Sequence, residues 1–552
     1  MSDAPSNLPV ITSDPTTTPA RIHDLPAELL SHIFALTVPA GMDRDWSRRV
    51  PPYMNVYRVC RHWRAISIAC QKLWSTSLPY KSLEWTKVCL ARCPTIPLEV
   101  RIDDRYLNDR YPAVQGGYRE AVAQVMQHWA RVRSLLLAPE FDPSDESWFA
   151  NELSRDSRDN LETLLGFLLR PNNQLEELRI DYGRGISVVA LNDWTPEALN
   201  LPQELFSSVH PPRLYRVELV RCGLPPTPPT QIFARSLRHL YLADTRAWLD
   251  VDSMIQYLQV MPMLERFEYE FSLDDHVFDC HPSRNHTARC VRLPHLASLK
   301  IEAYWVQSMT IFNYIAIPLE CNLHFSPNGW DYLEYTTEAI AADVLAMHNE
   351  SLKQHFAQAT SCGVAYHDVT ISDHGIKASS PYPRLDERSI PQKALLSPEF
   401  RSYIPGALAT RFRRAACRIL ASQSVTAGAS RLSLASAIWR FCPEVFDEYT
   451  AVRCLVLREN EEAEAFAAAA RRSDNMLFPS LQRVLFEPHV DCKPRLDILR
   501  ELAAALRDVY VAGGGSFKCL ALLDRDVVTE DMEREMRAIL GSEYITRRNS
   551  VW

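Results

Sequence analysis

The best candidates for chemistry in this sequence are two cysteines and two histidines between positions 280 and 290. Cys280, His281, His286 and Cys290 are separated by gaps that zinc ligands can have. A structural zinc site needs four such ligands held tetrahedrally on a tight turn. The intervening residues 282–285 predict an exposed loop, and no Cys-x-x-Cys pair supports the group. We therefore expect no metal site.

A glycine run at 513–515, followed by Ser516, is the second candidate. A phosphate loop would need Lys-Ser/Thr at a fixed spacing and a helix behind it. Residues 517–520 predict a strand instead, so we interpret the run as a turn. The sequence has no Gly-x-Ser-x-Gly elbow, and His62 beside Cys60 predicts an exposed residue on a helix. Since no nucleophile, base and orienting group come together, we expect a non-catalytic protein without a cofactor.

Composition narrows the class of protein further. The chain has 552 residues, 47% hydrophobic and 23% charged, which is typical of two or three globular domains. A net charge of −8 gives no support for nucleic-acid binding. Only 16 glycines against 37 prolines argue against a glycine-rich nucleotide fold and favour short elements with frequent stops.

The termini and cysteines predict the compartment. Residues 1–21 are rich in Ser, Thr, Pro and Asp and lack an apolar run, which predicts a disordered tail rather than a secretory signal. The 14 cysteines then indicate reduced thiols in an intracellular protein, cytoplasmic and/or nuclear. The uncharged stretch 303–319 is polar in places and shorter than the ~20 apolar residues that a bilayer requires, so no membrane partner is expected.

Two amphipathic helices are predicted between Ile22 and Trp74. In the first, Leu25, Leu29, Ile33 and Leu36 recur on one helical face, and Pro26 suits the first helical position. The second, over residues 57–74, has an apolar stripe and a basic face. The stripe consists of Val59, Trp63, Ile66, Cys70 and Leu73, and the basic face of Arg58, Arg61, Arg64 and Lys72. Helices this short cannot bury their own apolar faces, so we expect them to use the core of a partner.

These residues resemble an F-box. The resemblance rests on Leu25-Pro26-x-Glu28-Leu29-Leu30-x-x-Ile33-Phe34, then Val59-Cys60-Arg61-x-Trp63-Arg64, then Leu73-Trp74. It implies a partner, a Skp1-type adaptor, and through it a cullin ubiquitin ligase. The implied adaptor contacts are Leu25, Pro26, Leu29, Ile33, Leu36, Val59, Cys60 and Trp63. Trp63 is the expected anchor because buried tryptophans dominate interface energies. The segment Pro39–Asn55 is longer and more polar than the usual pattern.

Behind this module one pattern keeps returning, apolar-x-x-apolar-x-apolar, at intervals of about 20 to 45 residues, often after a proline. Its occurrences begin at Val132, Leu175, Leu214, Leu237, Leu264, Leu296, Val452, Leu481 and Phe517. Short strands alternating with helices at such intervals resemble a leucine-rich-repeat solenoid of parallel strands. The alternative is a plain α/β domain, since any strand entering a core shows the same pattern.

The predicted fold class is therefore α+β or α/β, with five segments. They are a tail (1–21), an F-box-like helical module (22–78), a repeat region (79–301), a degenerate or inserted helical region (302–450) with a mobile loop near 377–393, and C-terminal repeats (451–552). An F-box followed by irregular repeats resembles a large group of proteins in mushroom-forming fungi. This implies a substrate receptor that binds an unidentified protein target. The alternative is an interaction scaffold whose F-box-like helices pack internally.

Overall fold

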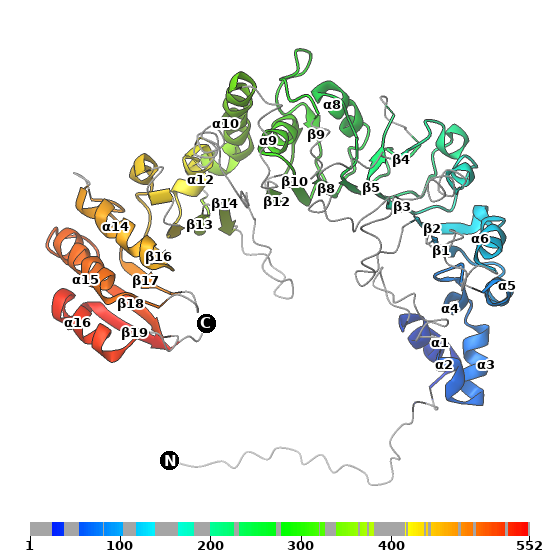
Figure 1. The fold of residues 1–552 in the computed structure, drawn as a ribbon, viewed down its shortest axis with the longest axis horizontal. Helices are drawn as coiled ribbons and strands as arrows, with labels where there is room; N and C mark the ends of the chain where they lie inside the picture. Colours follow the sequence, from blue (N-terminus) through cyan, green and yellow to red (C-terminus); the bar gives the residue numbers. More distant parts are fainter. Residues whose placement is uncertain are drawn as a thin grey trace, which may run out of the picture. The chain divides into compact units, whose positions relative to one another are not determined.

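The computed structural model describes 22, 25–37, 55–80, 82–102, 117–137, 164–181, 199–225, 231–271, 278–318, 321–325, 338–362, 365–372, 375–379, 415, 418–434, 438–439, 443–472, 476–488, 493–524 and 528–549. The chain divides into two compact units, Met1–Ser134 and Leu135–Trp552. Helices alternate with sheets of mostly parallel strands, so the chain has an α/β fold (Figure 1). The tail at 1–21 and most of the Pro39–Asn55 segment lie outside the described residues.

The first unit is helical at its start and ends in two strands. Its elements are α1 (Ala27–Leu36), α2 (Val56–Val59), α3 (Arg61–Ala69), α4 (Gln71–Ser75), α5 (Leu83–Arg92), β1 (Leu98–Ile102), α6 (Tyr118–Met126), η4 (Trp129–Arg131) and the start of β2 (Val132–Leu137). The Ser82 side chain accepts the amide of Trp85 and so caps the start of α5. The residues of β1 are buried and half-buried in turn.

Two expectations for the first helices are wrong. The helix α1 begins at Ala27, because Pro26 has an extended ψ of 147° while its carbonyl already accepts the amide of Leu30 at 3.1 Å. The single helix expected over 57–74 is three helices, α2, α3 and α4. It breaks at Cys60, whose φ of −157° is extended, and again at Cys70, whose ψ is 84°.

The second unit repeats strands and helices. Its elements are β3 (Glu177–Asp181), β4 (Leu199–Asn200), η7 (Leu205–Ser208), β5 (Arg216–Val220), β6 (Cys222–Gly223), β7 (His239–Ala243), α8 (Val251–Gln259), β8 (Arg266–Glu270), β9 (Val291–Arg292), β10 (Ser298–Glu302), α9 (Trp305–Tyr314), β11 (Ile315–Ala316), β12 (Asn322–Phe325), α10 (Glu338–Ser361), β13 (Asp368–Ser372), β14 (Gly375–Ser379), α12 (Ser424–Ala427), β15 (Arg431–Leu434), η9 (Pro443–Glu448), β16 (Cys454–Leu457), α14 (Asn460–Arg472), β17 (Arg483–Phe486), α15 (Leu496–Ala505), η10 (Leu506–Val511), β18 (Cys519–Asp524), α16 (Glu530–Leu540), η11 (Ser542–Tyr544) and β19 (Ile545–Asn549).

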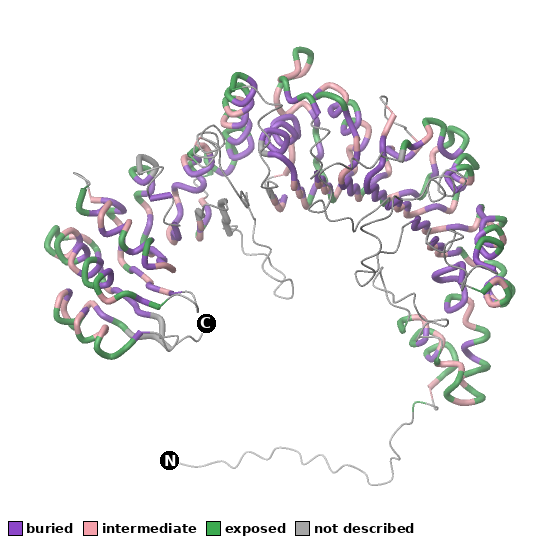
Figure 2. The backbone as a smooth tube through the Cα atoms, viewed as in Figure 1, coloured by how far each residue is buried: buried purple, intermediate pink, exposed green. Residues whose placement is uncertain are grey.

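The strands β3, β5, β7, β8, β10 and β12 lie side by side in that order and are all parallel. Their apolar positions are in register and are buried on the face that the helices cover (Figure 2). One such row consists of Leu178, Val217, Leu240, Phe267 and Leu299, and the next of Ile180, Leu219, Leu242, Tyr269 and Ile301. The second and third apolar positions of the sequence pattern therefore form the core.

The first apolar position of the pattern ends a tight turn just before several of the strands. The amide of Leu214 donates to the Pro211 carbonyl at 3.1 Å, and the amide of Leu481 donates to the Phe478 carbonyl at 2.9 Å. Proline fits such a turn because its fixed φ suits the bend. This explains why a proline so often precedes the pattern.

A second sheet has the order β14-β13-β15-β16-β17-β18-β19, parallel except for the β13–β14 hairpin. The region expected to be degenerate thus supplies β13 and β15 to this sheet, besides the helix α10. The expected loop near 377–393 begins inside β14, and residues 380–393 lie outside the described residues.

A polar cluster is buried between α9 and α10. His348 Nδ1 lies 3.0 Å from Asn313 Oδ1, and Arg289 Nη2 donates to His355 Nδ1 at 3.2 Å. The Arg289 guanidinium also lies over the ring of Phe312, 5.1 Å from its centroid. Burial and, secondarily, the Arg289 charge lower the pKa of both His348 and His355 to about 3, so both imidazoles are neutral at physiological pH.

Candidate docking surface

The helix α1 carries apolar side chains on two sides. Leu30 and Phe34 are buried in the first unit, with exposed fractions of 0% and 1%. Leu29, Ile33 and Leu36 are 51%, 36% and 70% exposed. Their spacing of four and three residues places them on one stripe of the helix. We call this set the α1 stripe.

Packing on the buried side fixes the orientation of α1. The rings of Phe34 and Trp63 lie 4.9 Å apart, and Cys70 Sγ donates to the Ser31 carbonyl at 3.6 Å. In addition, Trp74 Nε1 on α4 donates to the Ser67 carbonyl on α3 at 2.8 Å. These contacts hold α1 against α3 and α4, so the α1 stripe projects away from the unit's own core.

The break between α2 and α3 has a local cause. The Cys60 thiol accepts the amide of Trp63 at 3.4 Å and so caps the start of α3. Val59, directly before the cap, is 57% exposed. The extended backbone at Cys60 therefore interrupts the helix between α2 and α3. As a result, the apolar residues before and after Cys60 do not form one continuous helical stripe.

The eight residues expected to contact an adaptor fall into two groups. Pro26, Leu29, Ile33, Leu36 and Val59 are exposed, and Leu25, Cys60 and Trp63 are half-buried. Trp63, the expected anchor, packs on Phe34 and contributes to the unit's own core. The accessible apolar surface is therefore carried by the aliphatic side chains of α1, together with Val59 on α2.

The helices beside the α1 stripe are basic. Arg58, Arg61, Arg64 and Lys72 are exposed, and residues 57–74 contain no acid. Arg58 Nε donates to the Tyr57 hydroxyl at 3.2 Å, and Arg64 Nε donates to the Tyr57 carbonyl at 3.1 Å. The arginines thus have defined positions near α2.

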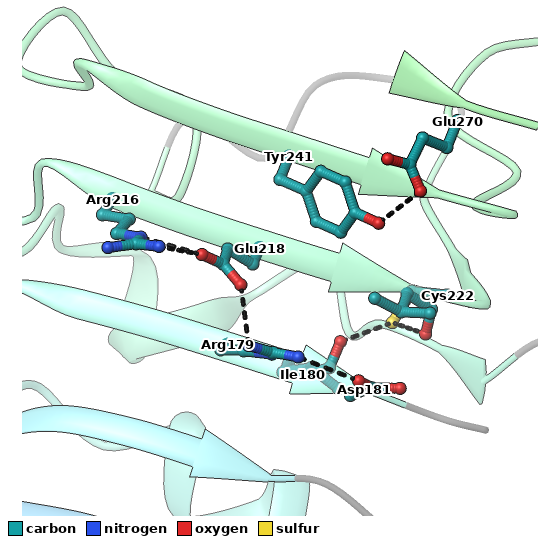
Figure 3. A network of polar contacts seen from close by, with 9 residues as sticks. Arg179, Ile180, Asp181, Arg216, Glu218, Cys222, Tyr241 and Glu270 are labelled. Atoms are coloured by element: carbon teal, nitrogen blue, oxygen red, sulfur yellow. Dashed lines mark hydrogen bonds and ion pairs between the residues drawn. The ribbon is translucent and has the colours of Figure 1, made fainter. Parts of the chain in front are cut away.

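A second candidate surface is the face of the β3–β12 sheet that points away from its apolar rows. Arg179 lies 3.2 Å from Asp181 and 3.2 Å from Glu218, and the Tyr241 hydroxyl donates to Glu270 at 2.6 Å (Figure 3). Arg179 is therefore compensated by two carboxylates, and the Glu270 carboxylate is hydrogen-bonded.

The same pairing continues on β10. Lys300 Nζ lies 2.8 Å from Glu270 and 3.0 Å from Glu302, which also contacts His324 at 3.4 Å. Burial alone would raise the pKa of Glu302, but hydrogen bonds from His324 and Lys300 lower it overall, so this carboxylate stays ionised. The face is polar but largely self-compensated.

Two side chains that sequence reasoning missed tie successive strands together. After β5, Cys222 Sγ lies 4.0 Å from the Ile180 carbonyl, and after β7, Thr245 Oγ1 donates to the Leu219 carbonyl at 2.9 Å (Figure 3 shows Cys222). Each stands three residues beyond the last apolar residue of its pattern. That fixed offset was the signal available in the sequence.

Other chemistry is limited among the described residues. Within those ranges, no group of three or more His, Cys, Asp or Glu side chains could hold a metal ion. Cys280, which precedes the predicted loop at 282–285, is buried and donates to the Phe278 carbonyl at 3.4 Å. An aromatic cavity of about 270 Å³ lies beside Trp248 and Tyr269.

None of the helices in the described ranges is long and apolar enough to cross a membrane.

Comparison with protein-family models and with curated proteins gives no match to this chain.

Proposed function

We propose that this chain is a non-catalytic substrate receptor of a Skp1-cullin-type ubiquitin ligase. Residues 22–78 would be the F-box that binds the adaptor, and the region behind them a leucine-rich-repeat-like solenoid that binds a protein target. The single observation that carries the proposal is the α1 stripe. Its three aliphatic side chains are exposed although Leu30 and Phe34, on the neighbouring side of the same helix, are fully buried.

Exposed aliphatic side chains arranged along one helix are a typical docking surface. Burying a leucine or isoleucine side chain contributes about 1.5–3 kcal/mol. Leu29, Ile33 and Leu36 together could therefore supply several kcal/mol to a complex, which exceeds what single scattered surface residues provide. Exposure of this stripe also counts against the alternative of a scaffold whose helices pack internally.

The repeat assignment is supported by Cys222 and Thr245. Leucine-rich repeats follow the pattern L-x-x-L-x-L-x-x-N/C, whose last residue bonds to the neighbouring repeat. Leu214, Val217, Leu219 and Cys222 stand at these spacings. Thr245 stands at the corresponding place one strand later and donates to the Leu219 carbonyl. The missing asparagine is thus replaced by other side chains that can reach the same carbonyl.

Size-exclusion chromatography with a purified Skp1-type adaptor tests the proposal. We expect the wild-type chain to elute with the adaptor and Leu29→Glu to elute separately, because a buried carboxylate would oppose docking. The matched control is Leu249→Glu, since Leu249 is 72% exposed and belongs to the second unit. A folded wild-type chain that forms no complex would contradict the receptor function and favour the scaffold.

A further inference from the structure

Four consecutive parallel strands of the second sheet each carry one cation where the strand starts. Arg431 and Arg483 are the first residues of β15 and β17, and Arg453 and Lys518 directly precede β16 and β18. The backbone places them in adjoining rows: the amide of Arg483 donates to the Arg453 carbonyl at 2.9 Å, and that of Lys518 to the Gln482 carbonyl at 2.8 Å. We call this set the basic edge.

Among the described residues, three of the four cations lack an ionic partner. Arg431 lies 3.7 Å from Asp368, but Arg453, Arg483 and Lys518 are exposed and form no ion pair within the described ranges. Cations at corresponding places on the β3–β12 sheet are paired. Examples are Arg238, directly before β7, with Glu265 at 3.0 Å and Arg216, the first residue of β5, with Glu218 at 2.8 Å. The basic edge is therefore a site of uncompensated positive charge, in a chain whose net charge is −8.

Apolar and thiol groups lie among these cations. The register places Cys454, Arg483 and Cys519 in one row, and Leu485 is the next outward residue on β17. Cys454, Leu485 and Cys519 are half-buried. Burial raises the pKa of the Cys454 thiol, and the charges of Arg431 and Arg483 oppose this, as expected if both guanidinium groups lie nearby.

The spacing of the cations suits an extended chain. Neighbouring strands lie about 4.8 Å apart, so Arg453 and Lys518, two strands apart, are separated by roughly 10 Å at the backbone. In an extended peptide every second side chain faces the same way, at intervals of about 7 Å. Carboxylates two residues apart on a peptide that crosses the strands would therefore face both of these long, flexible cationic side chains.

We propose that the basic edge binds an extended acidic segment of a partner protein, with carboxylates at every second residue. This deepens the proposed receptor function, on which it rests, by assigning the chemistry of the target. Binding of single-stranded nucleic acid would use aromatic stacking platforms. Thiols and an aliphatic side chain accompany these cations instead, which favours a peptide.

Fluorescence anisotropy tests the proposal with a labelled ten-residue peptide that has Glu at every second position and Val between. We expect Arg483→Glu and Lys518→Glu each to weaken binding about tenfold or more, because an attractive charge becomes repulsive. The matched control, Arg472→Glu on α14, should bind like wild type, since Arg472 is exposed on a helix. Circular dichroism establishes that each variant is folded.

A peptide with Gln in place of Glu should not bind. The proposal would be overturned if the Gln peptide bound as tightly as the Glu peptide, or if both edge variants bound the Glu peptide as tightly as the wild type. Tighter binding of an oligothymidine than of the acidic peptide would also overturn it.

Alkylation with iodoacetamide, read by mass spectrometry, locates the bound peptide. The peptide should slow modification of Cys454 and Cys519 but not of Cys362, which is exposed directly after α10. Unchanged modification of both edge thiols would contradict binding at this place. Because these assays contain no adaptor, peptide binding without an adaptor complex would refute only the receptor function. An adaptor complex without peptide binding would refute only this inference.

Discussion

The ring of Phe34 lies 4.9 Å from the ring of Trp63, at an interplanar angle of 54°, and this contact joins α1 to α3. Phe34 is 1% exposed, whereas Leu36, two residues later on the same helix, is 70% exposed. The first helix therefore separates residues that hold the unit together from residues that are available to a partner.

Alanine substitution should separate these two roles. We expect Phe34→Ala to lower the free energy of unfolding by about 3–5 kcal/mol, because it removes a buried aromatic ring and leaves a cavity. Leu36→Ala should change it by no more than about 0.5 kcal/mol, as is usual for an exposed side chain. Urea unfolding followed by tryptophan fluorescence would measure both. Equal losses would show that Leu36 belongs to the core.

Protonation of the buried histidines should destabilise the fold in mild acid. The pKa values of His348 and His355 are about 3 in the folded chain and near 6.5 when unfolded. The unfolded chain therefore takes up protons first as the pH falls below about 6.5, and each histidine lowers the free energy of unfolding by at most about 1.4 kcal/mol per pH unit.

Thermal unfolding measured between about pH 7.5 and about pH 5 would reveal this loss. His355→Gln should flatten the pH dependence because it removes one titrating group. His62→Gln, at an exposed position, is the control and should leave the dependence unchanged. If the stability of His355→Gln depended on pH as steeply as that of the wild type, the assignment of His355 as a buried, neutral group would be contradicted.

Two glycines should respond in opposite directions to alanine. A Cβ at Gly428 would lie 2.5 Å from the Cβ of Ala365, which is too short to move aside, so Gly428→Ala should cost about 1–3 kcal/mol. A Cβ at Gly166, in the helical turn 164–168, would meet nothing within 4 Å. Gly166→Ala should stabilise by up to about 1 kcal/mol through helix propensity. Calorimetry would measure the melting temperatures of both variants. A shift in the same direction for Gly428→Ala and Gly166→Ala would contradict the close packing of Gly428 against Ala365.

The bond between adjacent repeats can be tested at Thr245, whose hydroxyl donates to the Leu219 carbonyl at 2.9 Å and is buried. Thr245→Val keeps the shape but leaves this carbonyl without its donor, at an expected cost of about 1–3 kcal/mol in the free energy of unfolding. Thr450→Val, at an exposed position, should be nearly neutral. If the two variants were equally stable in chemical denaturation, the proposed role of Thr245 would be contradicted.

The strands were predictable wherever three large apolar residues mark them. The pattern at Leu214, Val217 and Leu219 works because two positions enter the core and the first ends the preceding turn. The strands β12, β15 and β19 were not predicted. Their first pattern position holds Glu320, Ala429 and Ser542, respectively, and none of these is a large apolar residue. Tertiary pairing with a neighbouring strand, which local sequence does not encode, decides these cases.

The candidate docking surface was predictable in part. The spacing of Leu29, Ile33 and Leu36 indicates one stripe. However, Leu30 and Phe34 form a second stripe on the same helix, and only the packing on Trp63 decides which stripe faces the core. The uncompensated charge of the basic edge also needed the register, since Arg453 and Lys518 are far apart in the sequence.

Isothermal titration calorimetry of the Skp1-type adaptor into the full chain would test the central claim most directly. We predict that Leu29→Ala/Leu36→Ala weakens binding by about 2–4 kcal/mol, a rise in Kd of about 30-fold or more, with an unchanged melting temperature. Leu249→Ala should retain the wild-type Kd. A double variant that binds as tightly as wild type would show that the α1 stripe is not the docking surface.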